Sequence, residues 1–142
     1  MRILLAIDNS TYSEAALKSV TSQFHSQGTQ VRVLHVLQPI AFAVPPQMSS
    51  GYAPELQDQR AIAENFLKQA AQTLQAAGFQ ADTEIAVGDI RECILDAAQN
   101  WPADMIVLGS RGRGKVGRFL LGSVAESVAR HAPCSVEIVR TR

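Results

Sequence analysis

Residues 105–126 read MIVLGSRGRGKVGRFLLGSVAE, and this stretch is the best guide to the fold. The apolar residues 105–108 are typical of a buried strand, and a loop rich in glycine and basic residues follows them. Ser123 and Glu126 have the spacing of a capping box, which indicates a helix with Ser123 as its N-cap. The stretch therefore predicts a strand, a loop and a helix in that order.

Four basic residues, Arg111, Arg113, Lys115 and Arg118, lie among the glycines of this loop. Glycine allows backbone N–H groups to approach an anion closely. The start of a helix adds N–H groups without intrahelical acceptors and the positive end of the helix dipole. We therefore predict that the loop binds the phosphates of a ligand, with a solvated basic surface loop as the alternative interpretation.

The rest of the chain shows the same alternation of short apolar runs with longer amphipathic segments. Strands are expected at residues 3–7, 31–37, 79–87, 105–108 and 136–139, and helices at residues 12–25, 55–77, 90–100 and 124–131. Because right-handed crossovers return each helix to the sheet, this order predicts helices on both faces of a mostly parallel sheet. The expected fold class is α/β: a three-layer sandwich with a five-stranded, doubly wound, Rossmann-like sheet.

Local signals mark several boundaries of these elements. Thr11 with Glu14 and Asp89 with Glu92 resemble capping boxes at the starts of two helices. Two glycines, at positions 28 and 78, follow helical stretches, as glycines at helix carboxyl ends do. Four prolines within residues 38–54 predict an irregular excursion between the second strand and the second helix.

The composition limits the class of protein. The 142 residues include thirteen Lys and Arg and thirteen Asp and Glu, so the formal net charge is zero, which argues against a surface devoted to nucleic acid or anionic membrane. The length predicts one domain over residues 1–142. No apolar run is long enough to cross a bilayer and no secretory signal is recognisable, so we expect a cytoplasmic protein. Cys93 and Cys134 lack disulfide-motif or zinc spacing and are expected to be reduced packing residues.

The strand order suggests where a ligand binds. In an open parallel sheet, ligands bind beyond the carboxyl ends of the strands, where the winding direction reverses. The glycine loop, Asp8 after the first strand and Val36 near the end of the second are expected to surround one crevice. Asp8 is suited to ribose hydroxyls or to a metal bound to phosphates, although aspartate in this position also closes turns. The backbone near Val36 is suited to an adenine edge, and His35 is interpreted equally as a packed residue or a ligand contact.

Competing motifs fit the loop less well. Residues 109–115 match Gly-x-x-x-x-Gly-Lys, but Val116 stands where a Walker A loop has the Ser or Thr that binds magnesium. Residues 112–117 match Gly-x-Gly-x-x-Gly, but no further strand and helix follow to complete a dinucleotide site. A nucleic-acid role lacks interleaved aromatic residues for base stacking. No catalytic triad or pair of acid–base carboxylates is recognisable.

With these residues in place, the chain resembles the nucleotide-binding branch of the universal stress protein family. The strongest element is Gly-x2-Gly-x9-Gly-Ser, which Gly109, Gly112, Gly122 and Ser123 match. Residues 3–10, ILLAIDNS, resemble the family's first strand and Asp-x-Ser turn, and residues 131–136, HAPCSV, resemble its entry to the last strand. Asn9 stands where the family often has glycine, which affects the turn more than the assignment.

This resemblance implies a cytoplasmic regulatory module of the stress response that binds ATP with Mg or Mn, with Asp8 near the ribose and as the candidate metal ligand. The nucleotide-binding residues expected are Ala6, Asp8, Ser10, Val36, Gly109, Arg111, Gly112, Gly122, Ser123 and Val124. The resemblance also implies a homodimer that pairs through the last strand near Val136 and Ile138 and so covers a sheet edge. A slow metal-dependent ATPase or phosphotransferase, and a nucleotide-free interaction protein with the same fold, are the alternatives.

Overall fold

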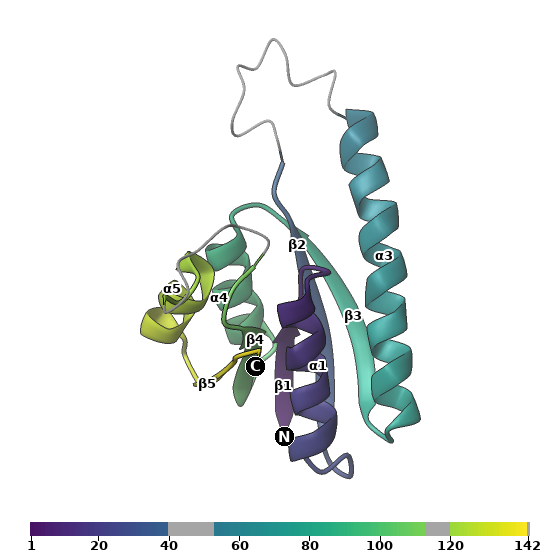
Figure 1. The fold of residues 1–142 in the computed structure, drawn as a ribbon, viewed down its shortest axis with the longest axis vertical. Helices are drawn as coiled ribbons and strands as arrows, with labels where there is room; N and C mark the ends of the chain where they lie inside the picture. The colour runs from purple at the N-terminus through teal and green to yellow at the C-terminus, as the bar shows by residue number, and fades with distance from the viewer. Residues whose placement is uncertain (40–52, 113–119, 142) are drawn as a thin grey trace.

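The computed structural model describes residues 1–39, 53–112 and 120–141 (Figure 1). Its strands are β1 (Arg2–Ala6), β2 (Gln30–Leu37), β3 (Gln80–Val87), β4 (Met105–Gly109) and β5 (Ser135–Val139). Its helices are α1 (Thr11–Gln23), α3 (Ala53–Ala76), α4 (Ile90–Asn100) and α5 (Ser123–His131). Each element expected from the sequence is present, and its ends lie within two residues of the predicted ones.

The strands of the described residues form a five-stranded sheet in the order β3-β2-β1-β4-β5, and every neighbouring pair is parallel. The chain winds outward from β1 through β2 to β3 and then returns to the other side of β1 with β4. The predicted doubly wound α/β fold is confirmed. The reversal falls between β1 and β4, so the loops that follow these two strands emerge side by side.

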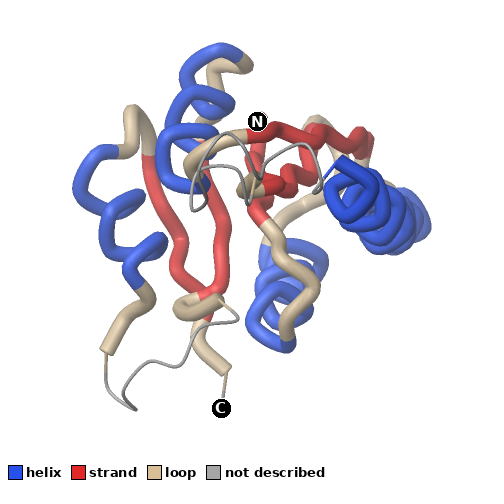
Figure 2. Tube along the Cα trace, turned by 90° about the horizontal axis from the view of Figure 1, so that it is seen from above, coloured by secondary structure: helices blue, strands red, loops and turns tan. Residues whose placement is uncertain are grey.

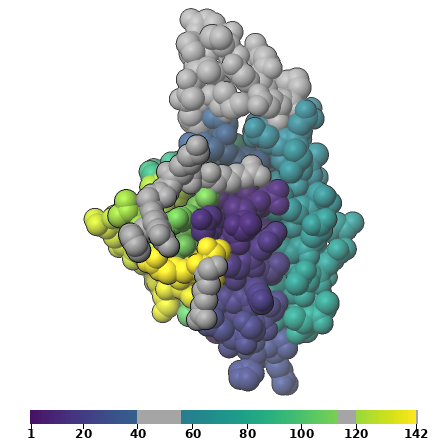
Figure 3. All heavy atoms as spheres, in the orientation of Figure 1, coloured from purple at the N-terminus to yellow at the C-terminus, as the bar shows by residue number. Residues whose placement is uncertain are grey.

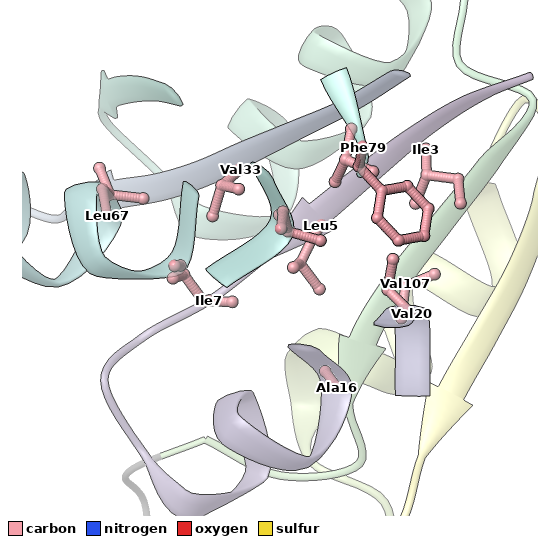
Figure 4. Close-up of a cluster of buried hydrophobic side chains, with 12 residues drawn as sticks. Ile3, Leu5, Ile7, Ala16, Val20, Val33, Leu67, Phe79 and Val107 are labelled. Atoms are coloured by element: carbon pink, nitrogen blue, oxygen red, sulfur yellow. The ribbon is translucent and has the colours of Figure 1, made fainter. Parts of the chain in front are cut away.

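The side chains of β1 divide between two cores because successive strand residues face opposite sides of the sheet. Ile3 and Leu5 are fully buried on one side among residues of α1 and α3, such as Ala16 and Leu67 (Figure 4). Leu4 is fully buried on the other side, among residues of α4 and α5. Seen from above, helices lie on both sides of the sheet, which gives the three layers (Figure 2).

The starts of the helices correct one boundary prediction and confirm another. The N-cap of α1 is Ser10 and not Thr11, because the Ser10 side chain accepts from Ser13 N–H and Thr11 is already helical. Asp89 is the N-cap of α4 as predicted, and its carboxylate accepts from Glu92 N–H at 3.1 Å. In both caps a side-chain oxygen accepts a hydrogen bond from a first-turn N–H group that has no acceptor within the helix.

Helix α3 begins at Ala53, two residues before the start expected from the sequence. Pro54 was expected in an irregular segment but lies in the first turn of α3, where a missing N–H costs no helical hydrogen bond. The other prolines of the predicted excursion, except Pro39, lie outside the described residues. The two predicted helix-end glycines, Gly28 and Gly78, have φ of 79° and 94°, the left-handed region that glycine enters readily.

The two cysteines are free thiols packed against the core on the α4 and α5 side. Burial raises the pKa of the Cys93 thiol, and the carboxylates of Asp96 and Asp89 raise it further. Burial, with the Asp104 carboxylate, raises the pKa of the Cys134 thiol. Neither thiol has the lowered pKa of an activated nucleophile. Within the described residues, no helix is long and apolar enough to cross a membrane.

Candidate functional site

The turn after β1 is built around one carboxylate oxygen of Asp8. Oδ1 accepts from Ser13 Oγ at 2.7 Å and from Ser10 N–H at 3.1 Å, while the Asp8 N–H donates to Ser13 Oγ at 2.8 Å. Asn9 follows with φ of 64°, a left-handed conformation that asparagine tolerates better than most residues. Asp8 is therefore a turn-closing residue, and the turn binds it to the start of α1.

The second carboxylate oxygen of Asp8 faces the loop after β4. A Cβ added to Gly112 would lie 2.9 Å from Asp8 Oδ2, so the loop passes directly over the carboxylate. The two segments are more than 100 positions apart in the chain. They meet because β1 and β4 are neighbours with parallel carboxyl ends. Asp8 and Gly112, which were both expected beside the crevice, are thus neighbours in the structure.

The described ends of the glycine loop are held together. Gly122 N–H donates to the Ser110 carbonyl, and Ser110 N–H donates to the Val139 carbonyl of β5, both at 2.8 Å. A Cβ on Gly122 would lie 3.2 Å from Arg111 Cα, so a larger residue here would crowd the loop backbone. Ser110 is 4% exposed and anchors the loop. The other basic residues predicted to contact phosphate, Arg113, Lys115 and Arg118, lie outside the described residues.

The helix that leaves the loop starts one residue earlier than predicted. Gly122 is the N-cap of α5, and Ser123 is its first helical residue, so Ser123 does not cap the helix. The expected capping box is wrong because Gly122 already has the extended backbone of a cap, and its carbonyl accepts the first helical bond, from Glu126 N–H. Ser123 is exposed and Val124 is half-buried, and both lie in the first turn of α5.

Gly109 has a packing role that the sequence did not indicate. A Cβ on Gly109 would lie 2.7 Å from Tyr12 Cβ and 3.0 Å from the Tyr12 backbone carbonyl. The first turn of α1 therefore rests directly on the last residue of β4. The sequence motif assigned Gly109 to ligand binding alone, whereas the absence of a side chain here is also required for the helix to reach its position.

Val36 lies where β2 continues past the end of β1. The last aligned pair of these strands is Ala6 with Leu34, and the Leu34 carbonyl then accepts from Ile7 N–H at 2.9 Å. Because alternate strand residues direct their main-chain groups to the same side, those of Val36 also face the β1 side, beyond Ala6. The Val36 side chain is 7% exposed and packs in the core, so only its backbone is directed toward the space beyond Ala6.

Two side chains that contact the turn after β1 were not assigned a role from the sequence. Ser13 ties Asp8 to α1, and its only sequence signal is its place three residues after Ser10. His35 was left open, and its Nδ1 lies 2.7 Å from the Ile7 carbonyl while its ring packs edge-on against Phe66. Among the described residues, no group of three or more His, Cys, Asp or Glu side chains could hold a metal ion.

Known proteins share the fold described above. The family model described as "Universal stress protein family" matches residues 1–140. The chain belongs to the universal stress protein family. A universal stress protein of Thermus aquaticus is 33% identical over 139 residues, covering 97% of each chain. The structure of universal stress protein UspA from Lactobacillus plantarum is similar with a TM-score of 0.88 and 28% identity, over 99% of this chain and 97% of that one.

Some structural neighbours of this universal stress protein contain adenine nucleotides. The universal stress protein from Archaeoglobus fulgidus, solved in complex with dAMP, has a TM-score of 0.71 and 24% identity, over 98% of this chain and 97% of that one. Universal stress proteins solved with cAMP and with AMP have TM-scores of 0.72 and 0.71, at 22% and 18% identity. At these identities the likeness establishes the shared fold, and the nucleotides are properties of those proteins.

Proposed function

We propose that this universal stress protein is a single-domain, cytoplasmic regulatory module that binds ATP in the crevice between β1 and β4. The observation that carries the proposal is the meeting of Asp8 Oδ2 with Gly112 at the point where the winding of the sheet reverses. A carboxylate oxygen accepts hydrogen bonds from ribose hydroxyls, and a loop without side chains lets phosphates approach backbone N–H groups. The adenine nucleotides of the structural neighbours support the choice of ligand class.

Different residues are expected to contact the adenine, the ribose and the phosphates of the nucleotide. The backbone of Val36 meets the adenine edge, because its main-chain groups face the space beyond the end of β1. Ala6, Asp8 and Ser10 lie on the ribose side, at the end of β1 and in the turn. The phosphates lie against Gly109, Arg111 and Gly112 from the loop and Gly122, Ser123 and Val124 at the start of α5, where first-turn N–H groups favour an anion.

A divalent cation fits this site as a companion of the phosphates. Oδ1 of Asp8 is engaged by Ser10 and Ser13, which leaves Oδ2 as the carboxylate oxygen toward the crevice. Asp8 could therefore supply one oxygen ligand to Mg²⁺ or Mn²⁺, and the other ligands would come from phosphate and water. A bound ion would neutralise phosphate charge, while Ser10 and Ser13 hold the carboxylate in place.

The proposal includes a homodimer formed through β5, an edge strand of the described sheet. Ser110 N–H bonds to the Val139 carbonyl, so Val139 directs its main chain toward β4, and the alternate residues Val136 and Ile138 direct theirs outward. The last described residues, drawn in yellow, are visible on the surface of the molecule (Figure 3). An outward row of N–H and C=O groups is suited to pairing with the same strand of a second copy.

The loop and the edge strand share an anchor, which supports a regulatory role. The Ser110 carbonyl accepts a hydrogen bond from Gly122 N–H, and the Ser110 N–H donates to the Val139 carbonyl. Nucleotide that changes the position of the loop therefore acts on the same residue that ends β5. Binding of ATP and pairing of β5 are expected to be linked, and linkage of two binding equilibria is reciprocal.

The proposal is tested by calorimetric titration of the protein with ATP, AMP and Mg²⁺. The variants are Gly122→Val, whose side chain would meet Arg111 Cα and the Ser110 carbonyl, and Asp8→Asn, which removes the carboxylate charge. Asp58→Asn, on the exposed surface of α3, is the matched control for the charge change. Thermal melting of each variant confirms that it is folded at the titration temperature.

We expect the wild type and Asp58→Asn to bind ATP equally, and Gly122→Val to lose measurable binding. Asp8→Asn is expected to weaken binding about tenfold, since a hydrogen bond to a charged group contributes about 1.5 kcal/mol. Absence of ATP binding to the folded wild type would contradict the proposal. ATP binding that survives both site substitutions unchanged would place the nucleotide elsewhere.

A further inference from the structure

The peptide group that joins Ile7 to Asp8 is held at both of its ends. Its carbonyl oxygen lies 2.7 Å from Nδ1 of His35. Because a carbonyl oxygen can only accept, Nδ1 carries the proton and donates to it. The N–H of the same peptide group donates to Ser13 Oγ at 2.8 Å. One planar unit is therefore fixed by β2 on one side and by α1 on the other.

The plane of this peptide group sets the direction in which the Asp8 side chain leaves the backbone. Rotation of the plane would break the bond from His35 and the bond to Ser13 together. It would also move the carboxylate away from Ser13 Oγ, which donates to Oδ1 at 2.7 Å. The oxygen that faces Gly112, Oδ2, would move with it. The hydrogen bond from His35 is therefore connected to the Asp8 carboxylate through this peptide group.

A ring of α3 packs against the imidazole and restricts its orientation. The His35 and Phe66 rings have centroids 4.9 Å apart and planes at 84°, an edge-on contact that aromatic rings favour. Phe66 is half-buried and packs against the core on the α1 and α3 side. His35 is also half-buried, at the carboxyl end of β2. The ring therefore has one defined position from which it reaches the Ile7 carbonyl.

We propose that His35 is a positioning residue of the nucleotide site, which holds the Ile7–Asp8 peptide group so that Asp8 presents Oδ2 to the ligand. The inference rests on the proposed function for the statement that Asp8 contacts a nucleotide. It goes beyond that function because it assigns a specific task to a side chain that is not itself required to contact the ligand. The donor at Nδ1 is the property that matters.

The test compares His35→Asn with His35→Leu. The side chains are similar in size, but only the asparagine amide places an N–H donor near the position of Nδ1. Amide hydrogen exchange of Asp8, measured by NMR without nucleotide, reports the peptide group directly. Titration with ATP and Mg²⁺ reports the site, and Asp8→Ala alone and combined with His35→Leu shows whether His35 acts through Asp8. Thermal melting verifies that every variant is folded.

We expect His35→Leu to speed exchange of the Asp8 amide and to weaken ATP binding, each about 3- to 10-fold, the effect of one lost hydrogen bond. His35→Asn is expected to stay within about twofold of the wild type in both. In the Asp8→Ala background, His35→Leu is expected to have no further effect on ATP binding.

Equal exchange rates of the Asp8 amide in the wild type and His35→Leu would overturn the inference. Effects of His35→Asn on exchange and ATP binding as large as those of His35→Leu would also overturn it. Full additivity with Asp8→Ala would overturn it as well, because His35 would then act independently of Asp8. If the folded wild type does not bind ATP, the proposed function fails on its own account. The exchange comparison still decides whether His35 holds the peptide group.

Discussion

The substitution Gly109→Ala tests the packing of the first turn of α1 against β4. The added methyl group would lie 2.7 Å from Tyr12 Cβ and 3.0 Å from the carbon and oxygen of the Tyr12 carbonyl. Non-bonded carbon atoms prefer separations of about 3.5–4.0 Å, so a gap of about 1 Å must open between the helix and the strand. The obstructing atoms are the helix backbone and a Cβ, which cannot turn aside as the end of a long side chain can.

The expected loss of stability follows from the core contacts of α1 that the displacement would disturb. Ala16 and Val20 of α1 are fully buried in the same core as Val107 of β4 (Figure 4), so displacement of the helix disturbs contacts already at core density. Overpacking of a core costs about 1–3 kcal/mol. At about 2.1 cal/mol/K per residue, unfolding of 142 residues has an entropy near 0.3 kcal/mol/K, so the melting temperature should fall by roughly 3–10 °C.

The assay is thermal and urea unfolding without nucleotide, and a second glycine separates steric overlap from backbone strain. Gly28 has nothing within 4 Å of an added Cβ, but its φ of 79° disfavours alanine. At Gly28, asparagine should be tolerated better than alanine because it enters the left-handed region more readily. At Gly109, asparagine should be worse than alanine because it is larger. A Gly109→Ala protein that melts within about 1 °C of the wild type would refute the packing argument.

Three further predictions concern the turn and the thiols. Asn9→Gly should leave the free energy of unfolding within about 0.5 kcal/mol, whereas Asn9→Val should lower it by about 1–2 kcal/mol, because φ is 64° there; equal urea midpoints would contradict this. Ser10→Ala should cost about 1 kcal/mol in the same assay through the lost N-cap of α1, and Ser10→Gly should cost less. Since the pKa values of Cys93 and Cys134 are raised, the pH profile of alkylation by iodoacetamide should lie higher for the native protein than for the urea-unfolded protein, and coincident profiles would argue against the shift. The folded thiols stay protonated at a pH where the unfolded chain ionises, so their contribution to stability is complete at neutral pH and declines as the pH rises through the alkaline range.

The fold was largely predictable because its signals are local. The apolar run at residues 105–108, the glycines after helices and the Asp89 cap each lie within a few residues of the feature that they mark. The repeated order of strand and helix then leaves few arrangements, since crossovers in parallel sheets are right-handed. The boundary errors at Thr11 and Ser123 have a shared cause: in each case the residue immediately before it already has the extended backbone of a cap.

The candidate site was predictable only in part. The motif of spaced glycines and the Asp8 turn predicted which segments lie close together, and the structure brings Asp8 and Gly112 together. The task of each group within the crevice was not readable from the sequence. Nothing in the sequence divides the two oxygens of Asp8 between the turn and the loop. That division depends on where Ser13 lies once α1 has packed against the sheet.

The sequence by itself determined the order of elements, the glycine loop and the family resemblance, because these depend on residue type and spacing along the chain. Only the tertiary structure decided that Gly109 makes room for Tyr12, that Ser110 links Gly122 to Val139, and that His35 holds the Ile7 carbonyl. The residues that meet in each of these contacts are 12 or more positions apart in the sequence. Such pairs meet only when strands align in register and helices pack against the sheet, so local sequence patterns do not predict them.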